Sequence, residues 1–572
     1  MKENIFESEI ASLSIINTPL KKVSSNEKNA SLNNTTKLNT LYISNQEYLI
    51  DYINDDTTVA LLKAIDLNNS SSFDVHTWSE YHEVNHAVDY IYKQLKSIDG
   101  FDMNSSVRKK HVKVVVLDLY VKWLTDPSMY SSYYRGHWYY HDIKGRYNKL
   151  FISKVTIKVV DALEQLGYLT SITGHYGREE GHSSHMARMR ATDTLISLIK
   201  DEFHITLEMV DVAPDTECIV MRDVIEIKDK KTKKVKQVNI PYEDTDYPEI
   251  VGWRFGLTEY NNLLRNTYID IPDFPKDGLI TKQRKTRLSV KGKVIEPRKI
   301  YINRCKKFIK RIFNNNNWQQ GGRFYGGWWQ RVPSEWRSRI RIWNMPVSEV
   351  DYKGLHIVLL YLLNGLEYQD DPYFLDDFEA TERMRNLLKL ILLSSINAKD
   401  KKEAIKAIRQ EINFNPDDYS WTKDIDLDIS ELLDAFVVKH KPIEKFFFTR
   451  RGIELQYIDS RIAEKVINHF TKLKIPVLCV HDSFVITADK AQDLLEVMRQ
   501  SFLTVLKELK LPIMNPKTTQ SGLGVGQWSV ILSDPHWRDY KESWVRERYD
   551  YPEWNNRLTQ FIERKFENYY QS

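Results

Sequence analysis

The sequence has few cysteines and no long apolar run. Its 572 residues include three cysteines, Cys218, Cys305 and Cys479, which lie far apart and form no CxxC pair. This spacing argues against a disulfide framework or a cysteine-based zinc site, and it favours a reducing compartment. Because no stretch of about 18 apolar residues and no charged-then-apolar N-terminus is present, we expect neither a membrane span nor a secretory signal.

The sequence also lacks a strong net charge. It carries 82 Lys and Arg against 78 Asp and Glu, a formal net charge of +4. A polyanion would therefore have to be bound by a local cluster of cations. Aromatic residues are abundant at 12%, and because such rings fill cores as well as stack on bases, they favour nucleic-acid binding only slightly.

The first part of the chain divides into a predicted arm and an ordered region. Residues 1–40 are rich in Ser, Asn, Lys and Thr, which is typical of a flexible arm. Within residues 41–225, apolar positions from Val155 to Leu166 recur with helical spacing, and two alternating segments follow around a Gly-rich turn. A helix followed by a hairpin is typical of a winged-helix unit that binds DNA or a partner. A small packing module without a ligand explains the pattern equally well.

The Gly-rich turn holds three histidines, His175, His182 and His185. Three histidines can bind a metal, but no acid or cysteine stands at a fixed spacing from them. A solvated polar loop is therefore the favoured interpretation.

Two basic clusters lie within residues 226–320 or at their edge. The segment from Lys228 to Lys236 is predicted to tip a hairpin, where its charges are solvated. The segment from Lys282 to Lys299 is longer and continues into Arg304, Lys306, Lys307, Lys310 and Arg311. A surface that tracks phosphates fits this second cluster, with a solvated face as the alternative.

Two acids stand in unusually apolar surroundings. Asp482 interrupts the run VLCVHDSFVI, and Asp351 follows VSEV and precedes YKGLHIVLLY. Adjacent antiparallel strands would bring the two carboxylates together, where they would repel and titrate upward unless they shared divalent cations. Two Mg²⁺ ions about 4 Å apart are typical of nucleotidyl transfer. Two acids that cap helices or pair with Arg are the alternative.

A helix predicted at residues 381–398, TERMRNLLKLILLSSINA, adds cations to this pair. Arg385 and Lys389 are four positions apart and share one face, and Asn397 lies two turns further along. Lys offers a compact positive charge and Arg offers a fork of N–H donors, and both are suited to binding the oxygens of a triphosphate. A surface helix with solvated cations is the alternative.

Four segments resemble motifs of family A DNA polymerases, the DNA polymerase I type. Gly322 to Phe324, together with Pro333 and Arg339 to Arg341, is similar to the primer-template segment, and Asp351-Tyr352 is similar to the first palm motif. Arg385 to Lys389 with Asn397-Ala398 is similar to the fingers motif, and His481 to Phe484 is similar to the last palm motif. The four segments follow one another in the order of the family. The last motif is closer still to its form in phage-type single-subunit RNA polymerases. The resemblance covers roughly residues 300 to 510.

The resemblance implies a role for each matched residue. The metal ligands would be Asp351, the Tyr352 carbonyl and Asp482, holding two Mg²⁺ ions or Mn²⁺ in their place. The catalytic residues would be Asp351, Asp482, Lys389, Arg385 and His481, with His481 near the primer end. The residues that bind the nucleotide would be Tyr352, His356, Arg385, Lys389 and Asn397.

Contacts to the primer-template are expected from two sets of cations. The first set follows from the resemblance and consists of Arg323, Arg331, Arg337, Arg339 and Arg341. The second set belongs to the basic cluster and consists of Lys306, Lys307, Lys310 and Arg311. Trp328 and Trp329 extend this surface, and for them packing in the core is as plausible as stacking on bases.

The sequence departs from the family at three positions. His356 stands where DNA polymerases carry a Glu that excludes the ribose 2′-hydroxyl, Asn397-Ala398 replaces an aromatic-Gly pair, and Ser483 replaces another Glu. The last change is similar to the RNA-making relatives. His356 is still bulky, so we expect deoxynucleotides to remain favoured, but less firmly.

The fold class expected is therefore α+β, a right-hand polymerase with an N-terminal winged-helix-like module. A thumb-like basic region is expected at residues 226–320, and the palm and fingers at 321–572, with pared-down fingers at 362–455. The expected activity is primer extension by a DNA-directed DNA polymerase; an RNA polymerase or primase on the same scaffold, or a non-catalytic DNA-binding replication or regulatory factor, is the alternative. Expected partners are primer-template DNA, deoxynucleoside triphosphates and other replication proteins, in the cytoplasm of a bacterial or mobile-element host or in a nucleus.

Overall fold

The computed structural model describes most of the chain after residue 69. The described residues are 39–43, 46–50, 67, 69–98, 101, 105–136, 140, 145–174, 186–228, 233–275, 278–287, 293–368, 370–425, 427–522 and 552–566. Almost all of the predicted arm at 1–40 lies outside them, as do His175, His182 and His185 and the centres of both basic clusters at 229–232 and 288–292.

The chain folds into two units that mix helices and strands, which confirms the α+β class. The first unit comprises residues 1–69, 175–185 and 280–299, and the second comprises the rest. A four-stranded sheet belongs mainly to the first unit; its order is β1 (Asn39–Ile43), β2 (Gln46–Ile50), β13 (Lys293–Ile300) and β12 (Leu279–Arg287).

The second unit begins with three helices and a small sheet. The helices are α3 (His82–Leu95), α4 (Ser105–Thr125) and α5 (Val155–Gln165). The sheet has the order β3 (Ser70–Ser72), β5 (Tyr130–Tyr133), β7 (Ala187–Ala191) and β6 (Leu169–Ile172). The predicted helix and strand pair at 155–191 are therefore present, with Val159 and Leu163 buried and Gly167 ending the helix at a φ of +73°.

Residues 226–320, predicted as a thumb-like basic region, are mainly strands in the part that the structure describes. β9 (Ile219–Lys228) and β10 (Lys233–Ile240) form the predicted hairpin. β14 (Lys310–Asn314) pairs with β9, and β15 (Asn317–Tyr325) pairs with β14, so the four strands form one sheet. The region contributes one long described helix, α7 (Ile250–Arg265), which contacts α15 (Gly452–Lys472). Both strands of the hairpin are rich in β-branched residues, which favour extended backbone: Val220, Val224, Ile225, Val235, Val238 and Ile240.

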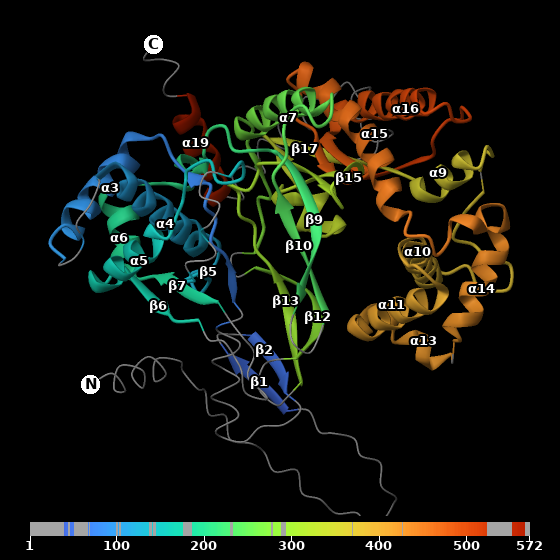
Figure 1. The fold of residues 1–572 in the computed structure, drawn as a ribbon, viewed down its shortest axis with the longest axis horizontal. Helices are drawn as coiled ribbons and strands as arrows, with labels where there is room; N and C mark the ends of the chain where they lie inside the picture. The colour runs from blue at the N-terminus through green and yellow to red at the C-terminus, as the bar shows by residue number, and fades with distance from the viewer. Residues whose placement is uncertain are drawn as a thin grey trace, which may run out of the picture. The chain divides into compact units, whose positions relative to one another are not determined.

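A six-stranded sheet lies at the centre of the C-terminal half. Its path is β11 (Ile269–Asp270), β16 (Arg341–Ile342), β17 (Met345–Tyr352), β19 (Ser483–Thr487) and β18 (Leu478–Val480), and β20 (Thr518–Gly522) also pairs with β17. Figure 1 shows α7, α15 and α16 (Ala491–Glu508) gathered beside β17. Apolar residues of β17 and β19 pack with these helices in one continuous core.

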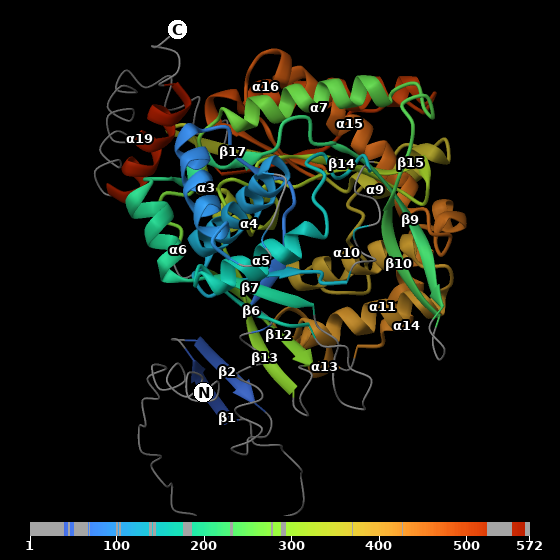
Figure 2. The same cartoon turned by 60° about the vertical axis from the view of Figure 1, so that its left-hand side comes forward.

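A group of helices follows α9 (Leu355–Leu363), and both cartoon views show it as one cluster (Figures 1 and 2). It contains α10 (Glu382–Asn397), α11 (Lys401–Phe414), α12 (Pro416–Tyr419), α13 (Trp421–Asp424) and α14 (Ile429–Lys439). The side chains of Thr381, Asp400 and Asp428 cap α10, α11 and α14 by accepting backbone N–H bonds, which explains where these helices begin.

Short elements and a final helix complete the described residues. The short elements are β4 (Thr77–Trp78), α6 (Asp193–Ser197), η2 (Leu198–Glu202), η3 (Leu207–Met209), β8 (Asp211–Val212), η4 (Trp328–Arg331), α8 (Ser334–Arg337), η5 (Lys441–Phe446) and η6 (Ala488–Lys490). No helix in the described part of the chain is long and apolar enough to cross a membrane.

The final helix, α19 (Pro552–Phe566), packs on β11 through apolar and charged contacts. Trp554, Leu558 and Phe561 are buried against Tyr268. Asp270 is fully buried and accepts hydrogen bonds from Arg304 Nε at 2.6 Å and from Arg557 Nε on α19 at 2.8 Å. This carboxylate therefore joins the last described helix to the six-stranded sheet.

We expect Asp270→Asn to lower the free energy of unfolding by about 3–5 kcal/mol, because it leaves two half-buried guanidinium groups without their counter-charge. Urea unfolding of the full chain measures this change. The control is Asp493→Asn, which removes an exposed surface ion pair with Lys490 and should change stability by less than about 0.5 kcal/mol. Equal effects of the two substitutions would show that α19 is not held in this way.

Candidate functional site

The structure places Asp351 and Asp482 close to each other where β17 ends and β19 begins, in the middle of the six-stranded sheet. β17 and β19 are antiparallel, and Asp351 lies opposite Ser483, the residue after Asp482. Val480 pairs with Ser483, so His481 and Asp482 form a two-residue turn between β18 and β19. The antiparallel pairing predicted from the two apolar runs thus brings both carboxylates together.

The two carboxylates repel each other. Burial raises the pKa of Asp351 from its ordinary 3.8 to about 7, the negative charge of Asp482 adds to this shift, and Glu349 contributes a smaller share. A hydrogen bond from the Tyr352 N–H and the positive charge of Lys389 oppose the shift. Two carboxylates in this arrangement fit an all-oxygen site for a divalent cation, whose charge would relieve the repulsion.

His481 is held in a strained backbone conformation beside this pair. Its φ is +61°, a region that residues with a side chain enter at a cost of about 1–3 kcal/mol. Its ring meets the Tyr325 ring edge-on, with 5.3 Å between centroids. Burial lowers the pKa of His481, and the nearby Arg323 lowers it further, so the neutral imidazole is favoured at this position.

Cations of α10 face the same carboxylates. The Lys389 charge acts on Asp351. Burial raises the pKa of Tyr373, and Asp482 and Asp351 add smaller shares; Lys389 and Arg385 lie 5.8 and 5.0 Å from the centroid of its ring. Arg385 is also paired with Asp371. Of the two cations of α10, Lys389 therefore acts on the acidic site directly, and Arg385 is held beside it by Tyr373 and Asp371.

Arg323 and His356 form a network with a residue that the sequence motifs did not single out. Arg323 Nε donates to Asp459 at 2.9 Å, its Nη2 also pairs with Asp459, and His356 Nε2 lies 3.0 Å from the same carboxylate. Although burial opposes it, Asp459 raises the pKa of Arg323, and the charge of Asp482 adds to this effect. A signal existed, since Asp459 stands within the buried stripe of Leu455 and Ile462 on α15.

A second buried pair supports the strands. Arg337 donates to both oxygens of Glu349, at 2.9 and 2.7 Å, and the Ser483 hydroxyl donates to the same carboxylate at 2.8 Å. Arg337, predicted to contact DNA, is thus bound within the protein. Ser483 holds β19 to β17 by this bond.

Arg311 is removed from the predicted phosphate surface by its burial. Its side chain is 1% exposed, its Nη1 pairs with Glu464 at 2.8 Å, and its guanidinium lies 4.5 Å from the Trp253 ring centroid. A cation enclosed in this way cannot touch a nucleic-acid backbone. Trp328 and Trp329 are also buried, which favours their packing role.

The remaining predicted DNA contacts have different surroundings. Lys306 and Lys310 lie near Asp74, burial lowers the pKa of both, and the charge of Arg331 also acts on Lys306. Lys307 donates to the Thr267 carbonyl at 2.7 Å, and Arg339 is paired with Asp273. Arg331 is exposed and Arg341 is half-buried. Lys306, Lys310 and Arg331 therefore share one neighbourhood, while Lys307 and Arg339 are bound by other groups of the protein.

Two predicted nucleotide contacts lie apart from the carboxylates. The Tyr352 side chain is buried and its hydroxyl donates to the Met498 carbonyl at 2.6 Å, which leaves only its backbone at the site. Asn397, at the end of α10, donates to the Leu393 carbonyl at 2.7 Å and lies so close to Gly452 that a Cβ there would collide with it. Asn397 therefore joins α10 to α15.

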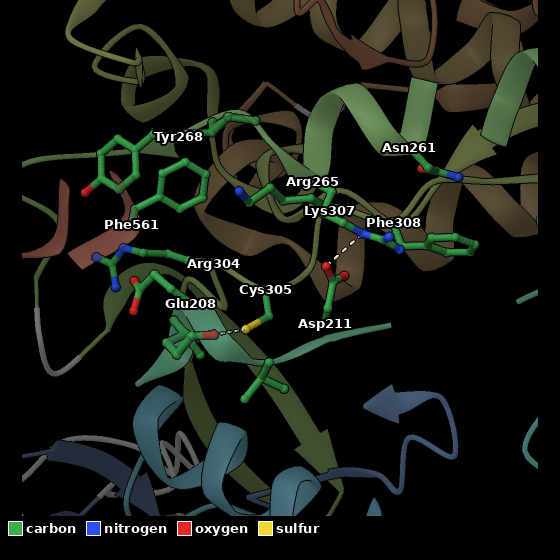
Figure 3. Close-up of a pocket in the computed structure, with 13 residues that line it drawn as sticks. Glu208, Asp211, Asn261, Arg265, Tyr268, Arg304, Cys305, Lys307, Phe308 and Phe561 are labelled. Carbon is green, nitrogen blue, oxygen red and sulfur yellow. Dashed lines mark hydrogen bonds and ion pairs between the residues drawn. The ribbon is translucent and has the colours of Figure 1, made fainter. Parts of the chain in front are cut away.

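Figure 3 shows a separate cavity of about 40 Å³, around Cys305. Arg265 pairs with Asp211 across it at 2.7 Å, and Lys307 is the predicted site residue among its lining. A space of this size holds about one water molecule, so it offers no room for a nucleotide.

No protein-family model matches the chain, and no curated protein is significantly similar to it. In the described residues, no three His, Cys, Asp or Glu side chains are grouped to hold a metal, so a divalent cation here would rely on the Asp351 and Asp482 pair. Mg²⁺ accepts such a site because it keeps water and phosphate oxygens as its other ligands.

Because of Asp351, we expect the free energy of unfolding of the metal-free protein to fall as the pH rises. The folded state keeps a proton on Asp351 that the unfolded chain loses above its ordinary pKa of 3.8, so this contribution is present at low pH and is lost as pH rises to about 7. Asp351→Asn should therefore stabilise the protein by roughly 2 kcal/mol more at pH 8 than at pH 5.

Urea unfolding with a chelator, at both pH values, measures this difference. Asp489→Asn, which changes an exposed acid just after β19, is the control and should leave the pH profile unaltered. Parallel profiles for wild type and Asp351→Asn would contradict the raised pKa of Asp351 in the folded protein.

Proposed function

We propose that this chain is a template-dependent nucleotidyltransferase, a DNA polymerase that extends a primer. The observation that carries the proposal is the carboxylate pair at the ends of β17 and β19, with the charge of Lys389 of α10 acting on it and Arg385 held nearby by Asp371. Acids for a metal pair beside cations for a triphosphate are the parts that nucleotidyl transfer needs. The resemblance of the surrounding segments to family A polymerases supports the same conclusion.

The proposed architecture is a right hand. The six-stranded sheet would be the palm, α10 to α14 would be compact fingers, and α5 with β6 and β7 would be a winged-helix-like module. In support, α10 shares one hydrophobic core with β17 and β19, so the helix with the cations is built onto the sheet with the acids.

In the proposed reaction the primer 3′-oxygen attacks the α-phosphorus of the incoming nucleotide and pyrophosphate leaves. Asp351 and Asp482 would hold two Mg²⁺ ions, which lower the pKa of the attacking hydroxyl and offset charge on the leaving group. Lys389 and Arg385 would neutralise the β- and γ-phosphates, and Arg385 is already oriented by Asp371. The neutral His481 ring, fixed by its turn and by Tyr325, would bound the primer end.

The sugar of the nucleotide would meet His356, which the Asp459 carboxylate holds at 3.0 Å. A ring fixed in this way keeps bulk where a ribose 2′-hydroxyl would lie, which favours deoxynucleotides. The alternative is an RNA polymerase or primase. It is favoured by Ser483, which stands at a position where DNA polymerases carry an acid, and whose hydroxyl donates to Glu349 here.

We expect Asp351→Asn and Asp482→Asn each to lower primer extension by about 10³-fold or more while primer-template binding is kept, because each removes a metal ligand. Extension of a labelled primer with Mg²⁺, alongside filter binding, measures both. Asp489→Asn removes an exposed acid seven residues away and should extend at the wild-type rate. Unchanged extension by either carboxylate variant would favour a non-catalytic DNA-binding factor instead.

We expect Lys389→Ala to lower kcat/KM for the nucleotide about 10²-fold, with a larger change in KM for the nucleotide than for the primer-template. Lys399→Ala, an exposed lysine beyond the end of α10, is the matched control. Deoxy- and ribonucleotides should be supplied in separate reactions, with and without a primer. Synthesis from ribonucleotides alone, without a primer, would replace the DNA assignment by an RNA polymerase or primase.

A further inference from the structure

A basic groove lies along α11, outside the carboxylate site. It encloses about 1230 Å³ and is lined by Lys401, Lys402, Ile405, Lys406, Arg409, Gln410, Asn413, Phe414 and Ser430. Apart from Ser430 of α14, all of these residues come from α11. The lining of the groove holds four cations and no acidic side chain, and one of the four, Lys401, is paired with Asp434.

Three of these cations are available to a ligand. Lys402, Lys406 and Arg409 are exposed, and within the described residues none of them forms an ion pair. Their spacing of four and three residues puts them on one face, at steps of about 6 and 4.5 Å along the helix. Lys401, in contrast, is held by Asp434 of α14 at 2.6 Å, which fixes one wall of the groove.

The groove also offers polar and aromatic groups. Gln410 and Asn413 supply amide donors and acceptors, and Phe414 at the end of α11 is 36% exposed. Cations in a row beside an exposed ring are the combination that binds a single strand, since the cations follow the backbone and the ring stacks on a base. A duplex keeps its bases stacked and offers this ring nothing.

We propose that the α11 groove binds single-stranded DNA, the unpaired part of the template that has not yet been copied. The inference rests on the proposed polymerase function for the identity of that strand. The groove is joined to the carboxylate site because α11 begins at Lys401, just after α10 ends at Asn397, and α10 carries Lys389 and Arg385. The unpaired template leaves the site past α10 and lies along Lys402, Lys406 and Arg409.

The test uses the full chain and primer-templates whose 5′ template overhang is about 2 or about 12 nucleotides long. Fluorescence anisotropy at several salt concentrations gives the affinity for each. Wild type should bind the long overhang at least about tenfold more tightly and with a steeper salt dependence. The triple variant Lys402→Gln, Lys406→Gln, Arg409→Gln should lose most of this gain, with the salt slope reduced by about 2.

The matched control is Lys93→Gln, Lys472→Gln, Lys507→Gln, which removes the same charge from three exposed lysines of α3, α15 and α16. It should keep the full gain from the long overhang. Equal losses in both triple variants, or a loss in the α11 variant that is the same for short and long overhangs, would overturn the proposal, since either would reflect general charge. All changes lie at exposed positions, and thermal unfolding confirms that each variant is folded.

Failure of this inference differs from failure of the proposed function. Asp351→Asn, measured on the short overhang, reports on catalysis alone. If it abolishes extension while the α11 variant keeps the overhang gain, the polymerase assignment stands and the groove has no role in template binding. If Asp351→Asn still extends the primer, the polymerase assignment fails, and the overhang comparison still reports whether α11 binds a single strand.

Discussion

The mutual repulsion of Asp351 and Asp482 is the constraint on which the candidate site depends. Asp351 of β17 pairs with Ser483 of β19, and this pairing holds the preceding residue, Asp482, beside Asp351. The sheet therefore holds two negative charges close together, and burial of Asp351 makes its ionised form still less favourable. A turn with a strained His481 adds a further cost. Such local costs are characteristic of sites organised for binding, since an element selected only for stability would have lost them.

The arginines around this centre are occupied by the protein itself. Arg323 is held by Asp459, Arg337 by Glu349 and Arg311 by Glu464. Buried ion pairs of this kind add little net stability, because desolvation offsets the attraction, yet losing one partner is costly. Their effect is to fix geometry: Asp459 aligns Arg323 and His356, and the Glu349 pair aligns β17 with β19. Residues assigned by motif to nucleic acid thus build the frame of the site.

The sequence was most informative where a pattern is local or repeats along the chain. The helices at α5 and α10 follow from their spacing pattern, the hairpin of β9 and β10 follows from the charged segment at its tip, and the pairing of Asp351 with Asp482 follows from two similar apolar runs. Burial of individual cations did not follow, because Arg311 and Arg331 look alike in sequence and differ only in what long-range packing places over them. Asp459 was missed for the same reason: its partners lie on β15 and α9, far from it in the chain.

The contact between Arg557 and Asp270 joins residues separated by 287 positions. At a synthesis rate of about 5–20 residues per second, Asp270 leaves the ribosome roughly 15 to 60 seconds before its second arginine is made. During that interval Arg304 alone balances its charge, and Tyr268 lacks the aromatic cover of Phe561. In the nascent chain, the face of β11 that α19 covers therefore stays without this cover until α19 has been synthesised.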